Sequence, residues 1–147
     1  SFASSTLIEI LPEEKIEGSV VYEISSFESI LLINENGKLI AKSLPNEAQI
    51  APIKSALVID VNNDGYKDII TVGNHYGVEV ETVRYDAGYG TVLLGNGKND
   101  FSFTPPEKSG FYVPSDSRDL KQLSIKGNNT FVVTNNNSSL SFFKEQQ

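Results

Sequence analysis

A nine-residue acidic stretch, Asp60 to Asp68, constrains this chain more than any other part of its sequence. It reads Asp-Val-Asn-Asn-Asp-Gly-Tyr-Lys-Asp, with side-chain oxygens at its first, third, fifth and ninth positions and glycine at its sixth. Ca2+ takes about six to eight oxygen ligands, and alternate carboxylates, a glycine turn and one backbone carbonyl supply most of them. We therefore predict a calcium site whose ligands are the side chains of Asp60, Asn62, Asp64 and Asp68 and the carbonyl oxygen of Tyr66.

The same ligand positions begin an EF-hand, which lies between helices and carries a bidentate glutamate at position 12. Position 12 is Thr71 here, and the flanking residues 56–59 and 69–72 are apolar and rich in β-branched side chains, which is typical of strands. We predict a calcium-type loop between two strands. The alternative is an Asx-rich turn whose acids only face water. Three carboxylates within nine residues, offset only by Lys67, favour the metal.

Composition limits the class of protein. At 147 residues, 39% hydrophobic and 21% charged, the chain is long enough for a folded domain with a core. A net charge of −7, without a run of basic residues, argues against a nucleic-acid partner. The sequence has no cysteine, no apolar run long enough to span a membrane and no methionine. We expect a processed or cloned piece of a longer product without a disulfide framework.

An internal repeat sets the predicted architecture. Residues 30–38 and 91–98 both run from an apolar strand into an Asn-Gly-Lys turn. Repetition of about four short strands with turn glycines is typical of propeller blades, which are stable only when packed against neighbours. We predict an all-β fold made of antiparallel four-stranded blades, two to three in number, from a β-propeller. When Gly65 is aligned with Gly127, the four side-chain ligand positions are occupied by Gln122, Ser124, Lys126 and Thr130. The second copy has therefore lost the metal.

Three units follow from this repeat. Residues 1–28 are predicted to hold an N-terminal segment with a short helical part and a lead-in strand from Ser19. Residues 29–90 form a first blade with the calcium loop and a long connecting loop, and residues 91–147 form a second blade without a calcium loop. Two to three blades cannot close a ring of about four to eight. Closure needs the remaining blades of a longer chain or another copy.

The long connecting loop, residues 73–90, carries the chain's only histidine, together with tyrosines, carboxylates and an arginine. Long loops on a rigid β scaffold often serve recognition, with tyrosine and arginine as contact anchors. The candidate recognition residues are His75, Tyr76, Glu79, Glu81, Arg84, Tyr85 and Asp86. The alternative, which we favour for the loop itself, is a self-packed connection. In it Arg84 pairs with Glu81 or Asp86, and the tyrosines cover apolar edges.

Enzyme signatures are missing from the sequence. It contains no nucleophile elbow, no second histidine and no glycine-rich phosphate loop that opens a helix. Glu81 with Glu79 or Asp86 is the acidic pair that a glycosidase would need, but the sequence does not fix their separation. We expect a protein without catalytic activity.

The acidic loop followed by Ile69-Ile70, together with the repeated apolar-Asn-Gly-Lys hairpins, resembles FG-GAP or VCBS repeats, the blades of integrin-α-like β-propellers. From about residue 29 to residue 143 the chain is similar to the C-terminal region of large bacterial VCBS-repeat proteins related to cartilage acidic protein, common in Bacteroidetes. The phrases that carry this likeness are residues 44–49, 73–79, 84–90 and 109–111.

That resemblance implies a secreted or outer-membrane-associated β-propeller in which Ca2+ rigidifies a blade. It implies adhesion, or recognition of a protein or glycan at the cell surface, with the calcium ligands already named and no catalysis. Two alternatives stay open. The chain is either a purely structural terminal segment that closes a larger propeller, or an accessory part of a carbohydrate-active enzyme.

Overall fold

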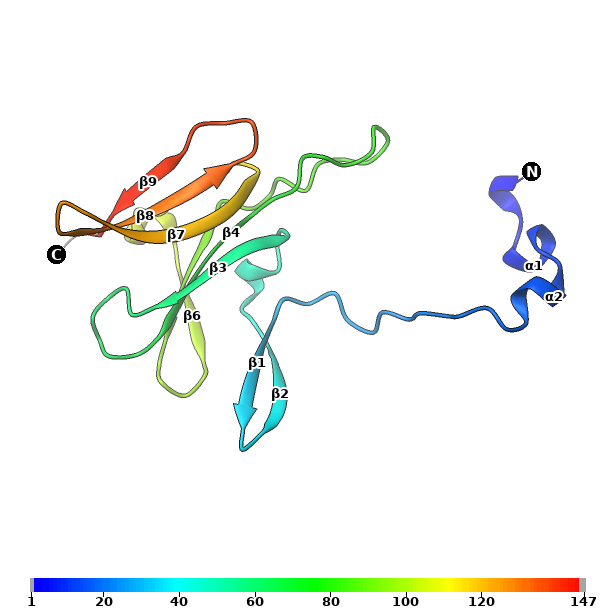
Figure 1. Cartoon of the computed structure of the whole chain (residues 1–147), viewed down its shortest axis with the longest axis horizontal. Coiled ribbons are helices and arrows are strands. Elements are labelled where there is room, and N and C mark those ends of the chain that lie inside the picture. Colours follow the sequence, from blue (N-terminus) through cyan, green and yellow to red (C-terminus); the bar gives the residue numbers. More distant parts are fainter. Residues whose placement is uncertain (1, 146–147) are drawn as a thin grey trace.

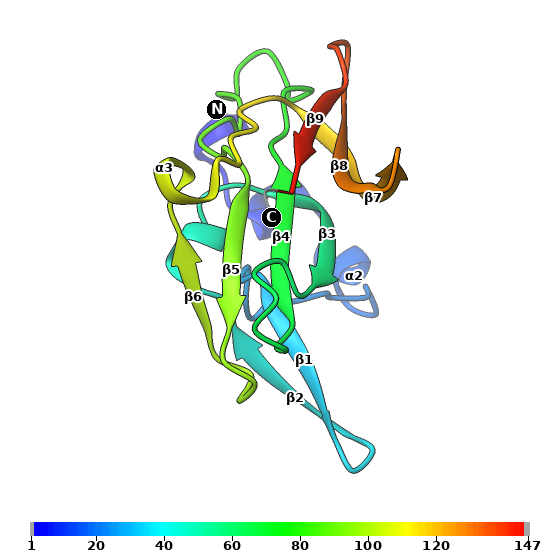
Figure 2. The ribbon, with the colours of Figure 1, turned by 90° about the vertical axis from the view of Figure 1, so that its left-hand side faces the viewer.

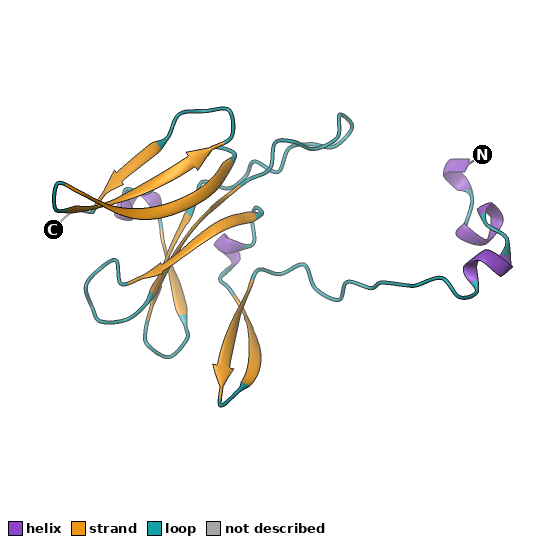
Figure 3. Cartoon of the chain, viewed as in Figure 1, coloured by secondary structure: helices purple, strands orange, loops and turns teal. Residues whose placement is uncertain are grey.

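The computed structural model describes residues 2–145, which form three antiparallel sheets preceded by an extended N-terminal segment (Figure 1). The strands are β1 (Ile30–Glu35), β2 (Lys38–Ser43), β3 (Ile53–Ile59), β4 (Asp68–Gly73), β5 (Thr91–Gly95), β6 (Phe101–Thr104), β7 (Ser117–Ile125), β8 (Asn128–Asn135) and β9 (Ser141–Lys144). The helical turns are η1 (Phe2–Ser4), α1 (Leu7–Ile10), α2 (Glu13–Ile16), η2 (Asn46–Ala48) and α3 (Pro106–Ser109). Figure 3 shows that strands dominate, which confirms the predicted all-β antiparallel class.

Each sheet is a meander in which strands pair in chain order. The hairpin β1-β2 stands alone, β3 to β6 form the central sheet, and β7 to β9 form what we call the terminal sheet. Figure 2 shows β6, β5, β4 and β3 side by side. The predicted boundary between residues 90 and 91 therefore falls between two paired strands of the central sheet. Across residues 2–145 the sheets do not close into a barrel or a propeller ring.

The central sheet is covered on both faces. On one face Ile70 and Val92 pack against the terminal sheet through Phe131 and Val133. On the other face Ile69 and Leu93 lie in a second cluster with Ala48, and Leu31 from the β1-β2 hairpin packs against it. Burial on two faces explains why every residue of β4 from Asp68 to Val72 is buried. Each such side chain contributes about 1.5–3 kcal/mol when it leaves water.

Two tight hairpins follow the turn chemistry of the sequence. Asn36 and Gly37 join β1 to β2 with φ of 54° and 87°, and Lys126 and Gly127 join β7 to β8 with φ of 52° and 78°. Two consecutive positive φ angles give the twist that a two-residue hairpin requires. The aligned positions Gln122, Ser124 and Thr130 lie within paired strands, so no loop corresponds there to the acidic stretch.

The N-terminal unit differs from the prediction in one respect. The helical turns α1 and α2 lie where a helical segment was expected, on either side of Pro12. The predicted lead-in strand from Ser19 is wrong, because residues 19–29 form no strand. The alternating pattern is present, but within residues 2–145 no partner strand lies beside it to complete a ladder.

Candidate functional site: the acidic loop and the arm

The acidic stretch joins β3 to β4, as predicted. Ile59 pairs with Asp68 at the last rung of the ladder, so residues 60–67 leave the sheet and return to it at one point. Positive φ angles at Asn63 (59°) and Gly65 (89°) give the loop its sharp turns. These residues are placed by the β3-β4 pairing and are open to solvent for most of their length.

Asp68 is fully buried, unlike the other acids of the loop. Its Oδ2 accepts a hydrogen bond from the Val61 N–H at 2.8 Å, and its Oδ1 accepts one from the Gly95 N–H at 2.9 Å. The carboxylate therefore ties the base of the loop to the end of β5. The sequence identified Asp68 as a ligand position and gave no sign of this tie, because Gly95 is distant along the chain.

The exposed acids are oriented by the backbone of their own loop. The carboxylate of Asp60 accepts from the N–H groups of Asp64 (3.1 Å) and Gly65 (2.9 Å), and that of Asp64 accepts from the Tyr66 N–H at 2.8 Å. Asn62 accepts from the Asp64 N–H at 3.2 Å and donates to the Asp64 carboxylate at 2.9 Å. Amide donors aimed at the carboxylates offset part of their mutual repulsion.

This donor set matches the chemistry of a hard cation. A carboxylate offers about four lone-pair sites, and each of Asp60, Asp64 and Asp68 spends two on the hydrogen bonds above. Acceptor capacity for a metal therefore remains at each one. In the part of the chain that the structure describes, no three acidic, histidine or cysteine side chains already converge on a single point. Binding would require the exposed side chains to rotate inward.

Tyr66 supplies more than a backbone carbonyl. A Cβ built on Gly97, in the β5-β6 turn, would lie 2.4 Å from the Tyr66 ring, so the ring rests directly against that glycine. Gly97 also has a φ of 73°, which a side chain would disfavour. Contact between the acidic loop and the neighbouring turn fixes the loop from a second side.

The long connection forms a protruding arm, which we define as residues 75–86 (Figure 1). His75 and Tyr85 close its base through two backbone hydrogen bonds, His75 N–H to Tyr85 O at 2.8 Å and Tyr85 N–H to His75 O at 3.1 Å. Near the tip the Thr82 N–H donates to the Glu79 carbonyl at 3.0 Å. Val80 and Val83 are exposed there. The arm is thus a two-legged projection with apolar side chains at its end.

Arg84 braces the arm through an aromatic ring. Its guanidinium carbon lies 5.1 Å from the centre of the Tyr76 ring, and the Tyr76 hydroxyl donates to the Pro114 carbonyl at 2.8 Å. The predicted pairing of Arg84 with Glu81 or Asp86 is wrong, since neither carboxylate lies within ion-pair distance of it. A guanidinium that lies over an aromatic ring stays hydrated on the side away from the ring. Such a contact can therefore form on an exposed arm.

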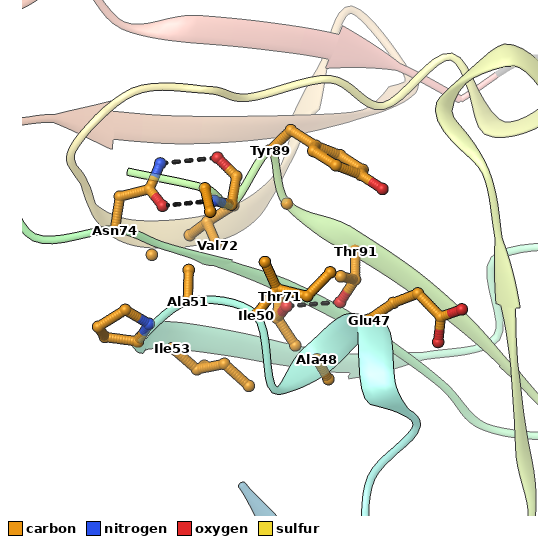
Figure 4. Close-up of a pocket in the computed structure, with 15 residues that line it drawn as sticks. Glu47, Ala48, Ile50, Ala51, Ile53, Thr71, Val72, Asn74, Tyr89 and Thr91 are labelled. Atoms are coloured by element: carbon orange, nitrogen blue, oxygen red, sulfur yellow. Dashed lines mark hydrogen bonds between the residues drawn. The ribbon is translucent and has the colours of Figure 1, made fainter. Parts of the chain in front are cut away.

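Asn74 anchors the arm and was missed by the sequence analysis. It is buried, and its amide exchanges two hydrogen bonds with the backbone of Gly88, at 2.7 Å and 2.9 Å (Figure 4). Its Nδ2 also lies 3.2 Å from the Pro114 carbonyl and 3.1 Å from that of Ser115. The adjoining cavity has a volume of about 20 Å³, which holds little more than one water. It is therefore not a ligand pocket.

Comparisons with protein-family models, with curated proteins and with solved structures gave no match. The likeness to FG-GAP repeats therefore rests on the residues quoted for it. Among the described residues, none of the helices is both long and apolar enough to cross a bilayer.

Proposed function

We propose that this chain is a non-catalytic, calcium-stabilised β-propeller segment of a secreted or cell-surface protein, and that it serves adhesion through recognition of a protein or glycan. The observation that carries the proposal is the acidic loop. Asp60, Asn62 and Asp64 project from one β-hairpin turn, beside the buried Asp68, and their hydrogen bonds leave oxygen acceptors free.

Calcium acts here as a clamp on the hairpin. A bound Ca2+ ion offsets two of the three negative charges that otherwise repel one another across the β3-β4 turn. Because Asp68 already bonds the end of β5, a metal that engages its free lone pairs couples the exposed loop to the central sheet. The role is structural, and it rigidifies the edge of the molecule on which the loop lies.

Recognition is assigned to the arm. Its base is closed by the His75–Tyr85 pairing and its side is braced by Tyr76 and Arg84, so its tip is held away from the sheets. A braced projection loses little conformational freedom when a partner binds. The exposed Val80, Val83 and Tyr85 supply apolar and aromatic contact area.

A purely structural role is the second candidate, and a specific observation favours it. Apolar side chains are exposed on the outer sheets at both ends of the stack, Ile30, Leu32 and Leu39 on the β1-β2 hairpin and Leu123 and Phe142 on the terminal sheet. Blades of a larger propeller would cover such surfaces.

Thermal unfolding with and without Ca2+ tests the metal assignment. For a site with a Kd of about 0.1–1 mM, about 2 mM free Ca2+ adds roughly 0.6–1.8 kcal/mol. That is a rise of a few degrees in Tm relative to excess chelator. Asp64→Ala is expected to abolish the rise, whereas Glu23→Gln, which removes one charge from the N-terminal segment, is expected to keep it. An unchanged Tm in the parent protein would overturn the assignment.

Binding to a panel of immobilised glycans and extracellular-matrix proteins separates recognition from the structural role. Tyr85→Ala is expected to weaken binding while Tm stays within about a degree, because an exposed side chain outside the core changes stability little. Absence of binding by the parent protein would favour the structural candidate. Hydrolysis of any glycan by the purified chain would contradict the non-catalytic assignment.

A further inference from the structure

The terminal sheet has one strand fewer than the central sheet. Both are meanders, and within residues 2–145 the last strand of each, β6 and β9, pairs with one neighbour only. The Glu145 N–H donates to the Asn129 carbonyl at 3.2 Å. This bond shows which residues of β9 direct their backbone groups toward β8. Since bonding residues alternate along an antiparallel strand, Phe142 and Lys144 direct their backbone N–H and C=O groups away from β8. β9 therefore presents a free edge.

A cleft lined by both aromatic and polar side chains opens beside this edge. It lies between the terminal and central sheets and has a volume of about 750 Å³. Its lining includes Phe111, Phe131 and Phe143, with Ile70 and Val92 behind them. The rings of Phe111 and Phe143 meet at 4.7 Å between centroids, so the aromatic floor is preformed. A strand added to β9 would direct every second side chain toward this floor.

The chain also contains a strand-like segment without a partner. Residues 19–25 alternate in the manner of a strand, with Val20, Tyr22 and Ile24 on one face, yet they form no ladder. These three side chains are 75%, 90% and 69% exposed. Figure 1 shows the segment running away from the sheets toward the N-terminus. Apolar surface of this kind gains free energy once it is covered.

Opposite net charges favour contact between the N-terminal segment and the terminal sheet. Residues 2–29 contain six glutamates and one lysine, whereas residues 117–145, the terminal sheet with its turns, contain four basic and two acidic side chains. The whole chain is acidic, whereas this sheet carries a net charge of +2, four basic side chains less two acidic ones. Opposite charges steer association and select the register of a docking strand.

We propose that residues 19–25 of one copy add as a fourth strand to the free edge of β9 in a second copy. Val20, Tyr22 and Ile24 enter the aromatic cleft, and the backbone groups of Phe142 and Lys144 gain hydrogen-bond partners. A second copy is the occupant because the segment leads into β1, whose hairpin packs on the face of the central sheet opposite the terminal sheet. Reciprocal exchange of the two segments gives a closed two-fold dimer.

Sedimentation of the full chain, with proline variants, tests the exchange. The parent protein is expected to be dimeric at about 100 μM and to dissociate on dilution, as mass action requires. With the added strand antiparallel to β9, Glu23→Pro and Lys144→Pro each remove an N–H that the new ladder uses, because residues bonded to Phe142 and Lys144 have side chains directed away from the cleft. Lys144→Pro spares the β8-β9 bonds because its N–H faces outward. Each variant is expected to lower the dimer fraction at least about tenfold with Tm at high dilution unchanged. A monomeric parent, or a dimer that survives both prolines, would overturn the proposal.

Disulfide mapping identifies the strands in contact, since the chain contains no cysteine of its own. Glu23→Cys and Phe142→Cys lie on the faces directed away from the cleft, and a mixture of the two single variants is expected to yield a cross-linked heterodimer under mild oxidation. Glu23→Cys mixed with Ser102→Cys, on the edge strand β6, is the control and is expected to give none. A double Glu23→Cys, Phe142→Cys variant that closes only within single chains would show that the segment folds back, against the two-copy exchange.

Discussion

The β3-β4 and β7-β8 hairpins open their respective meanders, yet they are closed in different ways. Both contain a glycine with positive φ, Gly65 at 89° and Gly127 at 78°. The terminal sheet needs only Lys126 and Gly127 to reverse the chain, whereas the central sheet uses residues 60–67. Strand pairing alone therefore does not require the acidic loop. A longer turn that concentrates carboxylates is costly without a counterion, which is the physical reason to assign it a ligand.

The largest expected effect on stability is at Asp68, the ninth residue of the acidic stretch. Thr130 is the residue aligned with it in the β7-β8 hairpin. Asp68→Ala leaves the N–H groups of Val61 and Gly95 without their acceptor, at a cost of about 1–3 kcal/mol for each buried group that stays unpaired. We expect a loss of about 2–4 kcal/mol in the free energy of unfolding by denaturant. The matched control is Thr130→Ala, because the Thr130 hydroxyl makes only a 3.5 Å contact within its own strand.

A loss below about 1 kcal/mol for Asp68→Ala would mean that the tie between the loop and β5 contributes little to stability. A loss of similar size for Thr130→Ala would remove the contrast between the two hairpins.

A change in stability of intermediate size is expected at the glycine with positive φ that both hairpins contain. Gly65→Ala and Gly127→Ala each place a Cβ in a left-handed conformation, although no neighbouring atom lies within 4 Å of the position that either Cβ would occupy. We expect each to cost about 1 kcal/mol from backbone strain alone, measured as a shift in the denaturation midpoint. Equal costs would support a common backbone requirement. A much larger cost at Gly65 with Ca2+ present than with chelator would show that the metal depends on this turn.

The smallest expected effect on stability is at the contact between the central sheet and the terminal sheet, where Ser55 meets Asp119. The Ser55 hydroxyl and then the Leu120 N–H, both donating to Asp119, hold the pKa of its carboxyl below its ordinary value. The ionised form therefore stabilises the fold above about pH 4, and this contribution is lost as the pH falls through the lowered pKa. Asp119→Asn is expected to flatten the decline of Tm as the pH falls below about 4.

Ser55→Ala provides the matched variant for that pH experiment, because it removes the leading donor and leaves the carboxyl in place. It is expected to flatten the same part of the profile to a smaller extent. Profiles identical to that of the parent protein in both variants would show that this contact does not contribute to acid unfolding.

The sequence predicted local elements well where a turn and its flanking strands are adjacent in the chain. The hairpin at Asn36-Gly37 and the strands on either side of the acidic loop are examples. It failed at Ser19, where the alternating pattern was correct but a ladder also needs a partner strand. It also failed at Arg84, because the Tyr76 ring is placed within reach only when the arm folds back on itself.

By itself, the amino-acid sequence determined the all-β class and the place of the acidic loop between two strands, because each of these depends on residues close together in the chain. Only the tertiary structure decided how strands group into sheets across residue 90, and that Asp68 joins the loop to Gly95. The same holds for the free edge of β9 beside an aromatic cleft. These features arise from contacts between distant segments, and periodicity within one segment carries no information about which other segment will cover it.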